Sequence, residues 1–508
     1  MDGLMTVEDT RAFDYVVIGA GSAGSAVTGR LVAQTGATVL VLEAGERGAD
    51  TGSLAEPTRW MENMGAAYDY GYHYEPHRAT HDRVLPLPRG KLLGGSGGIN
   101  GMLWTRGQHD DYDEWAAAGN RGWDYDSVLP LFRRSEDWED GAGPLHGAGG
   151  PVHVERAHGL HPVATALIRA GRSLGLPYLD DATSPAEGVG PSTLNVRDGR
   201  RENPWQAFVG PLADEDRLTV ATGADARRLT FSRGRCTGVE YAVDGHLSRA
   251  VARGEVVLCA GAIDTPRLLM RSGVGPADDL ADLGIEAVAD LPGVGRDLQE
   301  HVLAAGLCLE AAEPLGPLKN NLEGSVAFLR STGGSARPDL MFVTLQIPFV
   351  SPEIGEQYAP PENGFCIFPG LAAPRSRGRL TMHADGSLEI QPNLLAEQAD
   401  VDALVEAVDI GFELASDPAF ADITERWAVP DRRLDRAETA AFVRDAALPY
   451  FHAAGTCAMG PVVDEELRVH GVDGLRIADA SVMPAITRAF PHATTVMIGE
   501  QAGRLLTA

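Results

Sequence analysis

Two histidines near the end of the 508-residue chain are residues that could carry chemistry. His452 lies in FHAAGTCAMG, and His492 lies in FPHATTVMIGE. A neutral imidazole, with a pKa of about 6.5, is the side chain best suited to accept a proton at neutral pH. A histidine that follows a proline, as His492 does, is more commonly a capping or loop residue. Taken alone, His492 therefore leaves a chemical and a structural role open.

A second chemical signal is the glycine pattern in FDYVVIGAGSAGSAVTGRLVAQTGATVLVLEAGE. An apolar run leads into Gly19, Gly21 and Gly24, and a helix rich in small residues and a second apolar run follow. Strand, glycine turn, helix and strand in this order are typical of a dinucleotide-binding unit, in which backbone N–H groups hold a pyrophosphate. Glu43 ends the second strand, where a carboxylate accepts hydrogen bonds from an adenosine ribose. The pattern favours FAD or NAD over NADP.

A second glycine cluster lies in RGKLLGGSGGINGMLWTRGQHDDYDEW, residues 89–115. Each glycine costs about 1 kcal/mol relative to alanine in a helix interior, so this stretch cannot be a stable helix. Flexible linkers rarely carry apolar residues such as Ile99 and Trp104 among their glycines. The cluster therefore predicts a loop that lies close to something flat or charged.

These motifs resemble those of the glucose-methanol-choline (GMC) family of flavin oxidoreductases. The second glycine cluster is similar to the first signature of that family, and GAIDTPRLLMRSGVG, residues 261–275, is similar to its second. FHAAGTCAMG and LRIADASVMP, residues 475–484, are similar to its C-terminal elements. Such motifs extend from residue 13 to residue 504, which is nearly the whole chain.

The resemblance implies an α/β fold, with a doubly wound, Rossmann-like FAD-binding domain and an interleaved α+β substrate-binding domain that carries an antiparallel sheet. The expected FAD-binding segments are residues 10–155, 195–300 and 453–508, and the expected substrate-binding segments are residues 156–194 and 301–452. In the second domain we expect a helix from about His161 to Gly175 and strands within residues 339–350 and 364–371. The phenylalanines of these strands are expected in the core rather than at the substrate: Phe342, Phe349, Phe365 and Phe368.

The resemblance also implies which residues bind FAD. They are Gly19, Gly21, Ser22, Ala23, Gly24, Glu43, Ala44, Arg89, Gly94, Gly95, Ser96, Asn100, Gly101, Ala226, Asp479, Ala480, His492 and Thr494. In some family members a histidine directly before the loop asparagine bonds covalently to the flavin. This chain has Ile99 at that place, and isoleucine cannot form such a bond. We therefore expect a non-covalent FAD.

For catalysis, the resemblance implies that His452 is the principal base. His492 is expected to hydrogen-bond the substrate oxygen and to share the proton, so that the two histidines would titrate as a coupled pair. The other twelve histidines, His301 among them, are expected to be structural or solvated. No histidine pair has the spacing of a zinc motif, and no metal is expected.

The residues around the catalytic histidines depart from the usual family pattern. Ala453 replaces a common proline, and Phe490 replaces a common polar residue. With Phe451 they predict an apolar pocket mouth and favour an aromatic or aliphatic primary alcohol over a polyol. No carboxylate is assignable to the ammonium group of choline, which argues against choline.

The resemblance predicts an FAD-dependent alcohol oxidase or dehydrogenase that acts on CH–OH donors and passes electrons to O2 or another acceptor. A flavin-containing hydroxynitrile lyase is the alternative on the same fold, and a fatty-acid photodecarboxylase is a further option. A lyase would not bleach its flavin when substrate is added. A non-catalytic FAD-binding protein would keep its function after mutation of His452.

Composition limits the other partners and the compartment. The 43 basic and 71 acidic residues give a formal net charge of -28, which repels nucleic acid and anionic membranes. The five cysteines have no CxxC spacing, and an odd count leaves one outside any internal disulfide. The first residues carry acids where a signal peptide needs basic residues. We expect a cytoplasmic protein without a membrane or nucleic-acid partner.

Overall fold

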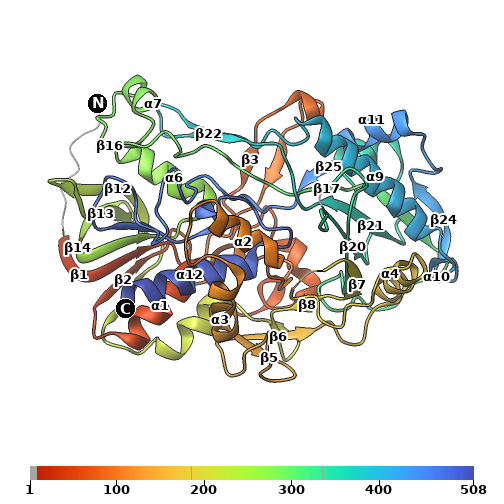
Figure 1. Cartoon of the computed structure of the whole chain (residues 1–508), viewed down its shortest axis with the longest axis horizontal. Coiled ribbons are helices and arrows are strands. Elements are labelled where there is room, and N and C mark those ends of the chain that lie inside the picture. The colour runs from red at the N-terminus through yellow and green to blue at the C-terminus, as the bar shows by residue number, and fades with distance from the viewer. Residues whose placement is uncertain (1–8, 185, 335) are drawn as a thin grey trace.

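A computed structural model describes residues 9–184, 186–334 and 336–508 of the chain. Two large β-sheets lie at opposite ends of the long axis of the molecule (Figure 1). Loops and short helices from several parts of the sequence fill the space between the sheets.

The first sheet has seven strands among the described residues, in the order β11-β2-β1-β14-β13-β12, with β26 beside β14. Their bounds are β1 Asp9–Ile18, β2 Val39–Leu42, β11 Leu218–Ala221, β12 Asp225–Ser232, β13 Arg235–Val243, β14 His246–Leu258 and β26 Leu475–Ile477. β11, β2, β1, β14 and β26 pair in parallel, whereas β13 and β12 extend the sheet in antiparallel pairing. All four residues of β2 are buried, as is typical of parallel strands with both faces covered.

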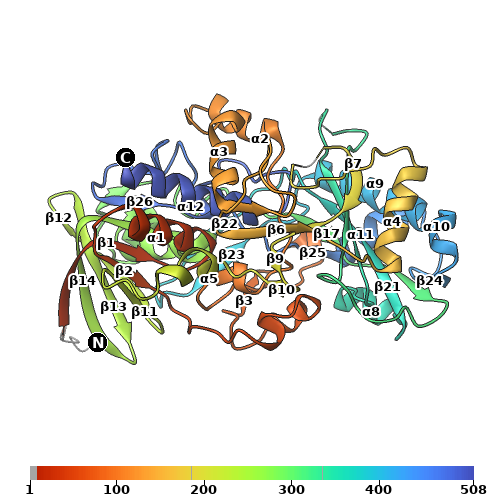
Figure 2. The ribbon, with the colours of Figure 1, turned by 90° about the horizontal axis from the view of Figure 1, so that it is seen from below.

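The helix α1 (Ser22–Gln34) joins β1 to β2, as the first glycine pattern predicts. It packs against the C-terminal helix α12 (His492–Thr507), and the two helices lie side by side in both views (Figure 2). A Cβ atom on Gly499 would lie 2.4 Å from the carbonyl oxygen of Ala23, so a glycine is required for this close approach. The predicted Rossmann-like α/β fold is confirmed.

The second sheet is antiparallel, in the order β24-β18-β21-β20-β19-β7, with β17 beside β21 and β25 beside β17. Its strands are β7 Gly188–Pro191, β17 Val302–Ala304, β18 Leu307–Ala311, β19 Ser325–Leu329, β20 Leu340–Leu345, β21 Gly364–Leu371, β24 Thr424–Val429 and β25 Ala447–Pro449. The helix α9 (Gln398–Ala415) packs on β21, and α4 (Pro162–Ser173) packs on β7 and β19. His161 caps α4, because its Nδ1 accepts the N–H of Val163 at 3.3 Å. The domain boundaries given above stay a prediction.

Shorter elements complete the described chain. The helices are α2 His109–Ala117, α3 Tyr125–Ser135, α5 Pro204–Phe208, α6 Gly261–Arg271, α7 Ala277–Asp282, α8 Pro352–Gln357, α10 Pro418–Ala421 and α11 Arg436–Ala446, with 3-10 turns η1 Gly52–Leu54, η2 Pro57–Asn63, η3 Arg78–Thr80, η4 Gly95–Gly98, η5 Gly210–Leu212 and η6 Ala480–Val482. The strands are β3 Tyr72–Tyr74, β4 Leu85–Leu87, β5 Glu136–Trp138, β6 Val152–Arg156, β8 Thr193–Leu194, β9 Val196–Arg197, β10 Arg200–Arg201, β15 Val274–Gly275, β16 Ala289–Asp290, β22 Arg379–Met382 and β23 Leu388–Gln391.

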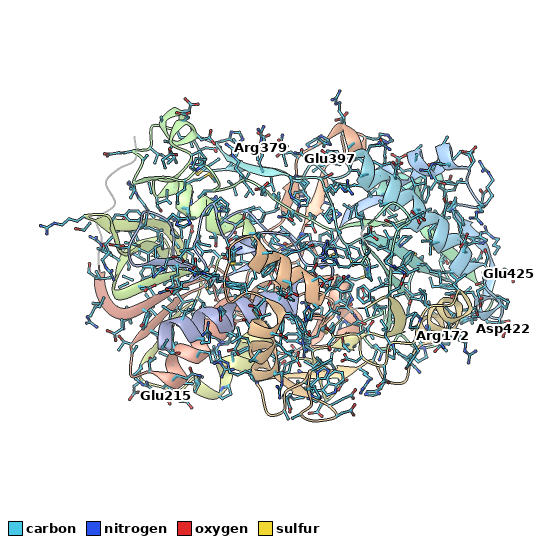
Figure 3. All side chains as sticks on the ribbon, in the orientation of Figure 1. Arg172, Glu215, Arg379, Glu397, Asp422 and Glu425 are labelled. Carbon is cyan, nitrogen blue, oxygen red and sulfur yellow. The ribbon has the colours of Figure 1, made fainter. Side chains whose placement is uncertain are left out.

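Charged side chains of both signs project from the periphery of the molecule (Figure 3). Arg172, Arg379, Glu215 and Glu425 are exposed examples. Of the helices that the structure describes, none is both long enough and apolar enough to cross a membrane. The five cysteines are all buried free thiols.

Candidate active site

A cavity of about 770 Å³ is lined by residues of both sheets and of the loops between them. Ile18 and Leu42, at the carboxyl ends of β1 and β2, line it from one side, and Leu345 and Phe368 line it from the second sheet. Its volume lies in the range of roughly 300–1,000 Å³ that is usual for small-molecule sites. Open α/β sheets bind ligands outside the carboxyl ends of their parallel strands.

The start of α1 has the properties of an anion site. Gly21 precedes the helix, and no side chain caps its first turn, so backbone N–H groups of that turn are free for a ligand. Gly19 adopts a φ of +99°, and a Cβ there would lie 2.4 Å from the Cys259 carbonyl oxygen. A Cβ on Gly24 would lie 2.0 Å from the carbonyl oxygen of Gly19. Both positions therefore require glycine for the turn itself, whereas Gly21 lines the cavity.

Glu43 lies at the end of β2 and lines the cavity. Its carboxylate accepts the N–H groups of Ala20 at 2.9 Å and Gly45 at 2.8 Å. Burial raises the pKa of Glu43 to about 7, and the two backbone donors oppose this shift. Each oxygen keeps a free lone pair, so the group is able to accept hydroxyl hydrogen bonds from a ribose.

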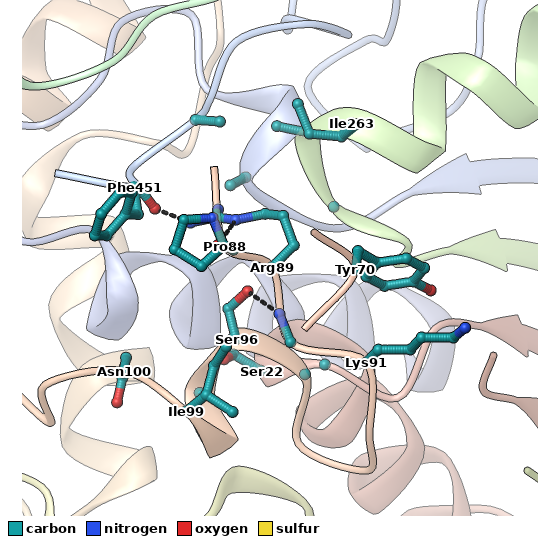
Figure 4. A pocket seen from close by; sticks show the side chains of 18 of the residues that line it. Ser22, Tyr70, Pro88, Arg89, Lys91, Ser96, Ile99, Asn100, Ile263 and Phe451 are labelled. Atoms are coloured by element: carbon teal, nitrogen blue, oxygen red, sulfur yellow. Dashed lines mark hydrogen bonds between the residues drawn. The ribbon is translucent and has the colours of Figure 1, made fainter. Parts of the chain in front are cut away.

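The second glycine cluster forms the opposite side of this part of the cavity. The N–H of Gly94 donates to the carbonyl of Ala20 at 2.8 Å, which ties the loop to the start of α1. Gly95 has a φ of +53°, and a Cβ there would lie 2.7 Å from the Cα of Gly21. In Figure 4 the side chains of Ser96, Ile99 and Asn100 of this loop lie below those of Arg89 and Phe451 in the pocket. The loop and the helix start form the narrow cradle that the backbone of a dinucleotide requires.

The structure brings most of the predicted cofactor residues to one cavity. The residues that line it are Gly19, Gly21, Ser22, Ala23, Glu43, Ala44, Arg89, Gly95, Ser96, Asn100, Gly101, Ala226, Asp479, Ala480 and His492. Three predicted contacts lie behind this lining: Gly24 and Gly94 serve the turns described above, and the Thr494 hydroxyl shares a 2.7 Å hydrogen bond with the Tyr112 hydroxyl. The residues present fit FAD.

His452 also lines the cavity, and its surroundings hold it in one place. Its backbone N–H donates to Glu300 at 2.5 Å, and its ring stacks on Tyr450 with 5.4 Å between ring centroids. Phe490 packs edge-on against the same ring at 5.6 Å. Burial, with smaller contributions from His301 and Arg89, holds the pKa of His452 well below its usual value. The imidazole is therefore neutral at pH 7 and able to accept a proton.

The partner of the His452 ring is His301. The two Nδ1 atoms lie 2.9 Å apart with perpendicular rings, so one donates a proton to the other. When His452 is the donor, its Nε2 is unprotonated and free to act as a base. From the sequence His301 was expected to be a structural or solvated histidine, and its contact with His452 was not found. In the structure His301 is fully buried, and its ring lies beside that of His452. No local pattern pointed to it, since 151 residues separate the two rings in sequence.

His492 is the first residue of α12, and it makes no capping hydrogen bond. Its ring packs edge-on against Trp104 at 5.3 Å, and a Cβ on Gly97 would lie 2.9 Å from its Nε2. Burial, with a contribution from Arg201, lowers its pKa to about 3. Neither ring nitrogen has a hydrogen-bond partner among the described residues, and the residue lines the cavity.

Apolar side chains of the second sheet line the same cavity as His452, beside the polar groups of Arg89 and Tyr450. Leu303, Leu345, Phe349 and Phe368 line it. Phe368 is also buried in the core of the second sheet, as expected, and Phe349 packs against that core, whereas Phe342 and Phe365 are fully buried away from the cavity. Glu323 lines the same cavity and accepts a hydrogen bond from the Asn321 amide at 2.9 Å. Glu323 is therefore a candidate carboxylate for a cationic substrate group, which the sequence analysis did not find. It was missed because nothing in the local sequence shows that Glu323 turns inward.

Burial raises the pKa of Glu323 to about 8, against about 4.5 for an exposed glutamate. The folded chain therefore keeps a proton that the unfolded chain releases, and this group lowers the free energy of unfolding as pH rises from 4.5 to 8. Within that window the free energy of unfolding falls by up to about 1.4 kcal/mol per pH unit because of this group.

For the FAD-free protein we expect Glu323→Gln to melt at a more nearly constant temperature than the wild type between pH 6 and pH 8. The check is thermal unfolding at several pH values in that interval. Parallel curves for the two proteins would show that Glu323 is not the group responsible.

One cluster outside the cavity has ligand types that metals use. Oxygen or nitrogen atoms of His109, Asp110 and Asp113 lie within 4.8 Å of one another at the start of α2. The cluster is largely exposed, and His109 forms an ion pair with Asp113 at 3.0 Å. It has no link to the cavity, and no role in the reaction follows from it.

The chain is similar to known proteins over almost its whole length. The family profile described as GMC oxidoreductase matches residues 13–303 and, with its C-terminal part, residues 374–499. An uncharacterized GMC-type oxidoreductase of Mycobacterium tuberculosis (strain ATCC 25618 / H37Rv) is 37% identical over 527 residues, covering 98% of this chain and 99% of the relative. Choline oxidase of Arthrobacter globiformis is 35% identical over 529 residues, covering 100% and 96%. The crystal structure of pyridoxine 4-oxidase from Mesorbium loti superimposes with a TM-score of 0.91 at 33% identity, covering 97% and 98%.

Proposed function

The chain belongs to the GMC oxidoreductase family, a family of FAD-dependent enzymes that act on alcohol donors, and from this premise we propose that His452 is the base that removes the hydroxyl proton of a small primary alcohol. The observation that carries the proposal is the half-buried, neutral imidazole of His452 at the cavity wall, with His301 at its Nδ1.

FAD, when bound, supplies the acceptor for the hydride that leaves the alcohol carbon. His452 accepts the hydroxyl proton at Nε2, and its Nδ1–H donates to His301 throughout. His301 thereby fixes the tautomer of the base and stabilises the positive charge that His452 gains. Neutral His492 has one ring N–H, which donates to the substrate oxygen or to the cofactor. Apolar side chains around His452 exclude water from this proton transfer.

Binding of FAD is proposed to be non-covalent. Ile99 lines the cavity at the place where some relatives carry the attaching histidine, and it offers no nucleophile. Acid precipitation of the purified protein tests this point, because a non-covalent flavin stays in the supernatant.

The test of the reaction is an anaerobic titration with a panel of primary alcohols, in which the visible absorption band of the flavin is followed. Bleaching supports alcohol oxidation. Fast return of colour in air supports an oxidase, and slow return supports a dehydrogenase with another acceptor. Bound flavin that no alcohol bleaches would argue against the proposal and would favour the lyase, which cyanohydrins then test.

The lining of the pocket supports an aromatic or aliphatic alcohol as substrate. A specific observation favours a second class, alcohols that carry a positive charge, because Glu323 is a buried carboxyl group without an ion-pair partner among the described residues. Burial keeps Glu323 largely protonated at pH 7, and a bound cation would lower its pKa and stabilise the ionised form. Choline oxidase is one of the relatives above, and its name gives such an alcohol as its substrate.

Glu323→Gln separates the two substrate classes. We expect kcat/KM for a cationic alcohol to fall by about 10- to 100-fold, because the amide keeps the shape but removes the charge that pairs with the cation. The uncharged alcohol of the same shape is the control and is expected to change by less than about twofold. Equal losses for both alcohols would assign Glu323 a purely structural role. The measurement is steady-state kinetics of the two proteins with both alcohols.

A further inference from the structure

Arg201 is a buried positive charge without a negative partner. Four arginines are buried in the part of the chain that the structure describes: Arg83, Arg106, Arg201 and Arg476. The other three form ion pairs with Glu353, Glu136 and Glu255, respectively. No carboxylate of a described residue pairs with Arg201, and burial alone lowers its pKa, to about 9. An uncompensated buried charge is costly to a fold, so its retention requires a reason.

The side chain of Arg201 is fixed directly behind the second glycine cluster. Its Nη1 donates to the Asn100 side-chain oxygen at 2.7 Å and to the Gly97 carbonyl at 3.4 Å, and its Nε donates to the Leu54 carbonyl at 2.9 Å. The buried Nη2 has no hydrogen-bond partner. Gly97 and Asn100 both line the cavity. The guanidinium charge therefore lies one residue layer behind the cavity wall.

A second source of positive potential reaches the same wall. The amino end of α12 begins at His492, whose ring is adjacent to Gly97. A helix of this length carries partial positive charge at its amino end. The neutral ring of His492 adds two unpaired nitrogen atoms and no opposing charge. This wall is suited to an anion.

The proposed reaction produces such an anion. Hydride transfer adds two electrons and one proton to the neutral ring system of FAD, and the hydroxyl proton goes to His452. The ring system thus gains one negative charge when the alcohol becomes a carbonyl. We propose that Arg201 is the resident countercharge for reduced FAD, held behind the glycine loop by Gly97 and Asn100. This inference rests on the proposed function.

The experiment measures the midpoint potential of the flavin in the holoenzyme, together with the affinity for oxidised FAD. For Arg201→Gln we expect the affinity for reduced FAD to fall at least tenfold more than that for oxidised FAD, which lowers the potential by about 30 mV for a two-electron couple. Arg201→Lys keeps the charge and is expected to keep the potential within half of that shift while the melting temperature falls. The matched control is Arg197→Gln on the neighbouring strand β9, where Arg197 is half-exposed and pairs with Glu202 at 2.6 Å.

An unchanged potential in Arg201→Gln would overturn the inference, and equal losses of affinity for both redox states would assign the charge to the phosphates instead. If Arg201→Gln fails to retain FAD, Arg201→Lys decides alone, because a drop of about 30 mV despite the retained charge contradicts a charge-based role. Absence of FAD from the wild-type protein would refute the proposed function itself, which keeps the two failures distinct.

Discussion

Replacing His452 by alanine is expected to slow reduction of the bound flavin by alcohol about 10²- to 10⁴-fold, the usual contribution of a positioned general base. The alcohol proton then has no acceptor in the pocket, and only hydroxide from solution supplies the deprotonated substrate. The residual rate is therefore expected to rise with pH. Rapid-mixing measurement of flavin bleaching at saturating alcohol, at several pH values, gives the rate directly.

Two further measurements distinguish the loss of the His452 imidazole from damage to the fold. His452→Ala is expected to keep wild-type FAD content, because His452 is not one of the residues predicted to bind FAD. Added imidazole is expected to restore part of the rate, since the deletion leaves room beside His301. The control is His73→Ala, because His73 is exposed and does not line the cavity. A wild-type rate in His452→Ala would remove this residue from the mechanism.

Replacing Gly95 by alanine is expected to weaken FAD binding by at least about 100-fold, which corresponds to about 2.7 kcal/mol. The new Cβ would lie 2.7 Å from the Cα of Gly21, so the loop has to move away from the start of α1. The positive φ of Gly95 adds the cost of a left-handed conformation for a residue with a side chain, about 1 kcal/mol. Titration of the FAD-free protein with FAD, followed by fluorescence, measures the loss.

Gly149→Ala is the matched control for this prediction. Gly149 has a similar positive φ of +72°, but a Cβ there meets nothing within 4 Å. It carries the backbone cost without the collision and lies in an exposed turn, so FAD affinity is expected to stay at the wild-type value. Equal weakening in both variants would show that backbone strain, rather than the closed cradle, explains the effect.

Several parts of the site were predictable because their signals are contiguous in sequence. The turn at Gly19 and Gly24 requires glycine for local steric reasons, and the following helix and strand are read from the same short stretch. Glu43 ends the second strand of that unit, and it lines the cavity as its position suggested. Family resemblance added His452, which also reaches the cavity, while its role in catalysis stays a prediction.

Sequence reasoning was weakest for the expectation that His452 and His492 act as a coupled pair. His452 has His301 at its Nδ1, whereas His492 lies against Trp104 and Gly97. Both histidines belong to recognisable motifs, but the motif gives only a position along the chain. The direction of each ring depends on how α12 and the end of the second sheet pack.

The sequence by itself determined the α/β class, the dinucleotide cradle and the family, because each depends on backbone requirements or motifs that lie within short stretches. Only the tertiary structure decided the chemical surroundings of the pocket: His301 beside the base, the inward carboxyl of Glu323, and the unpaired Arg201 behind the glycine loop. These three properties are set by burial and by contacts between residues far apart in sequence. Burial changes the charge and pKa of a side chain without leaving a local mark in the sequence that encodes it.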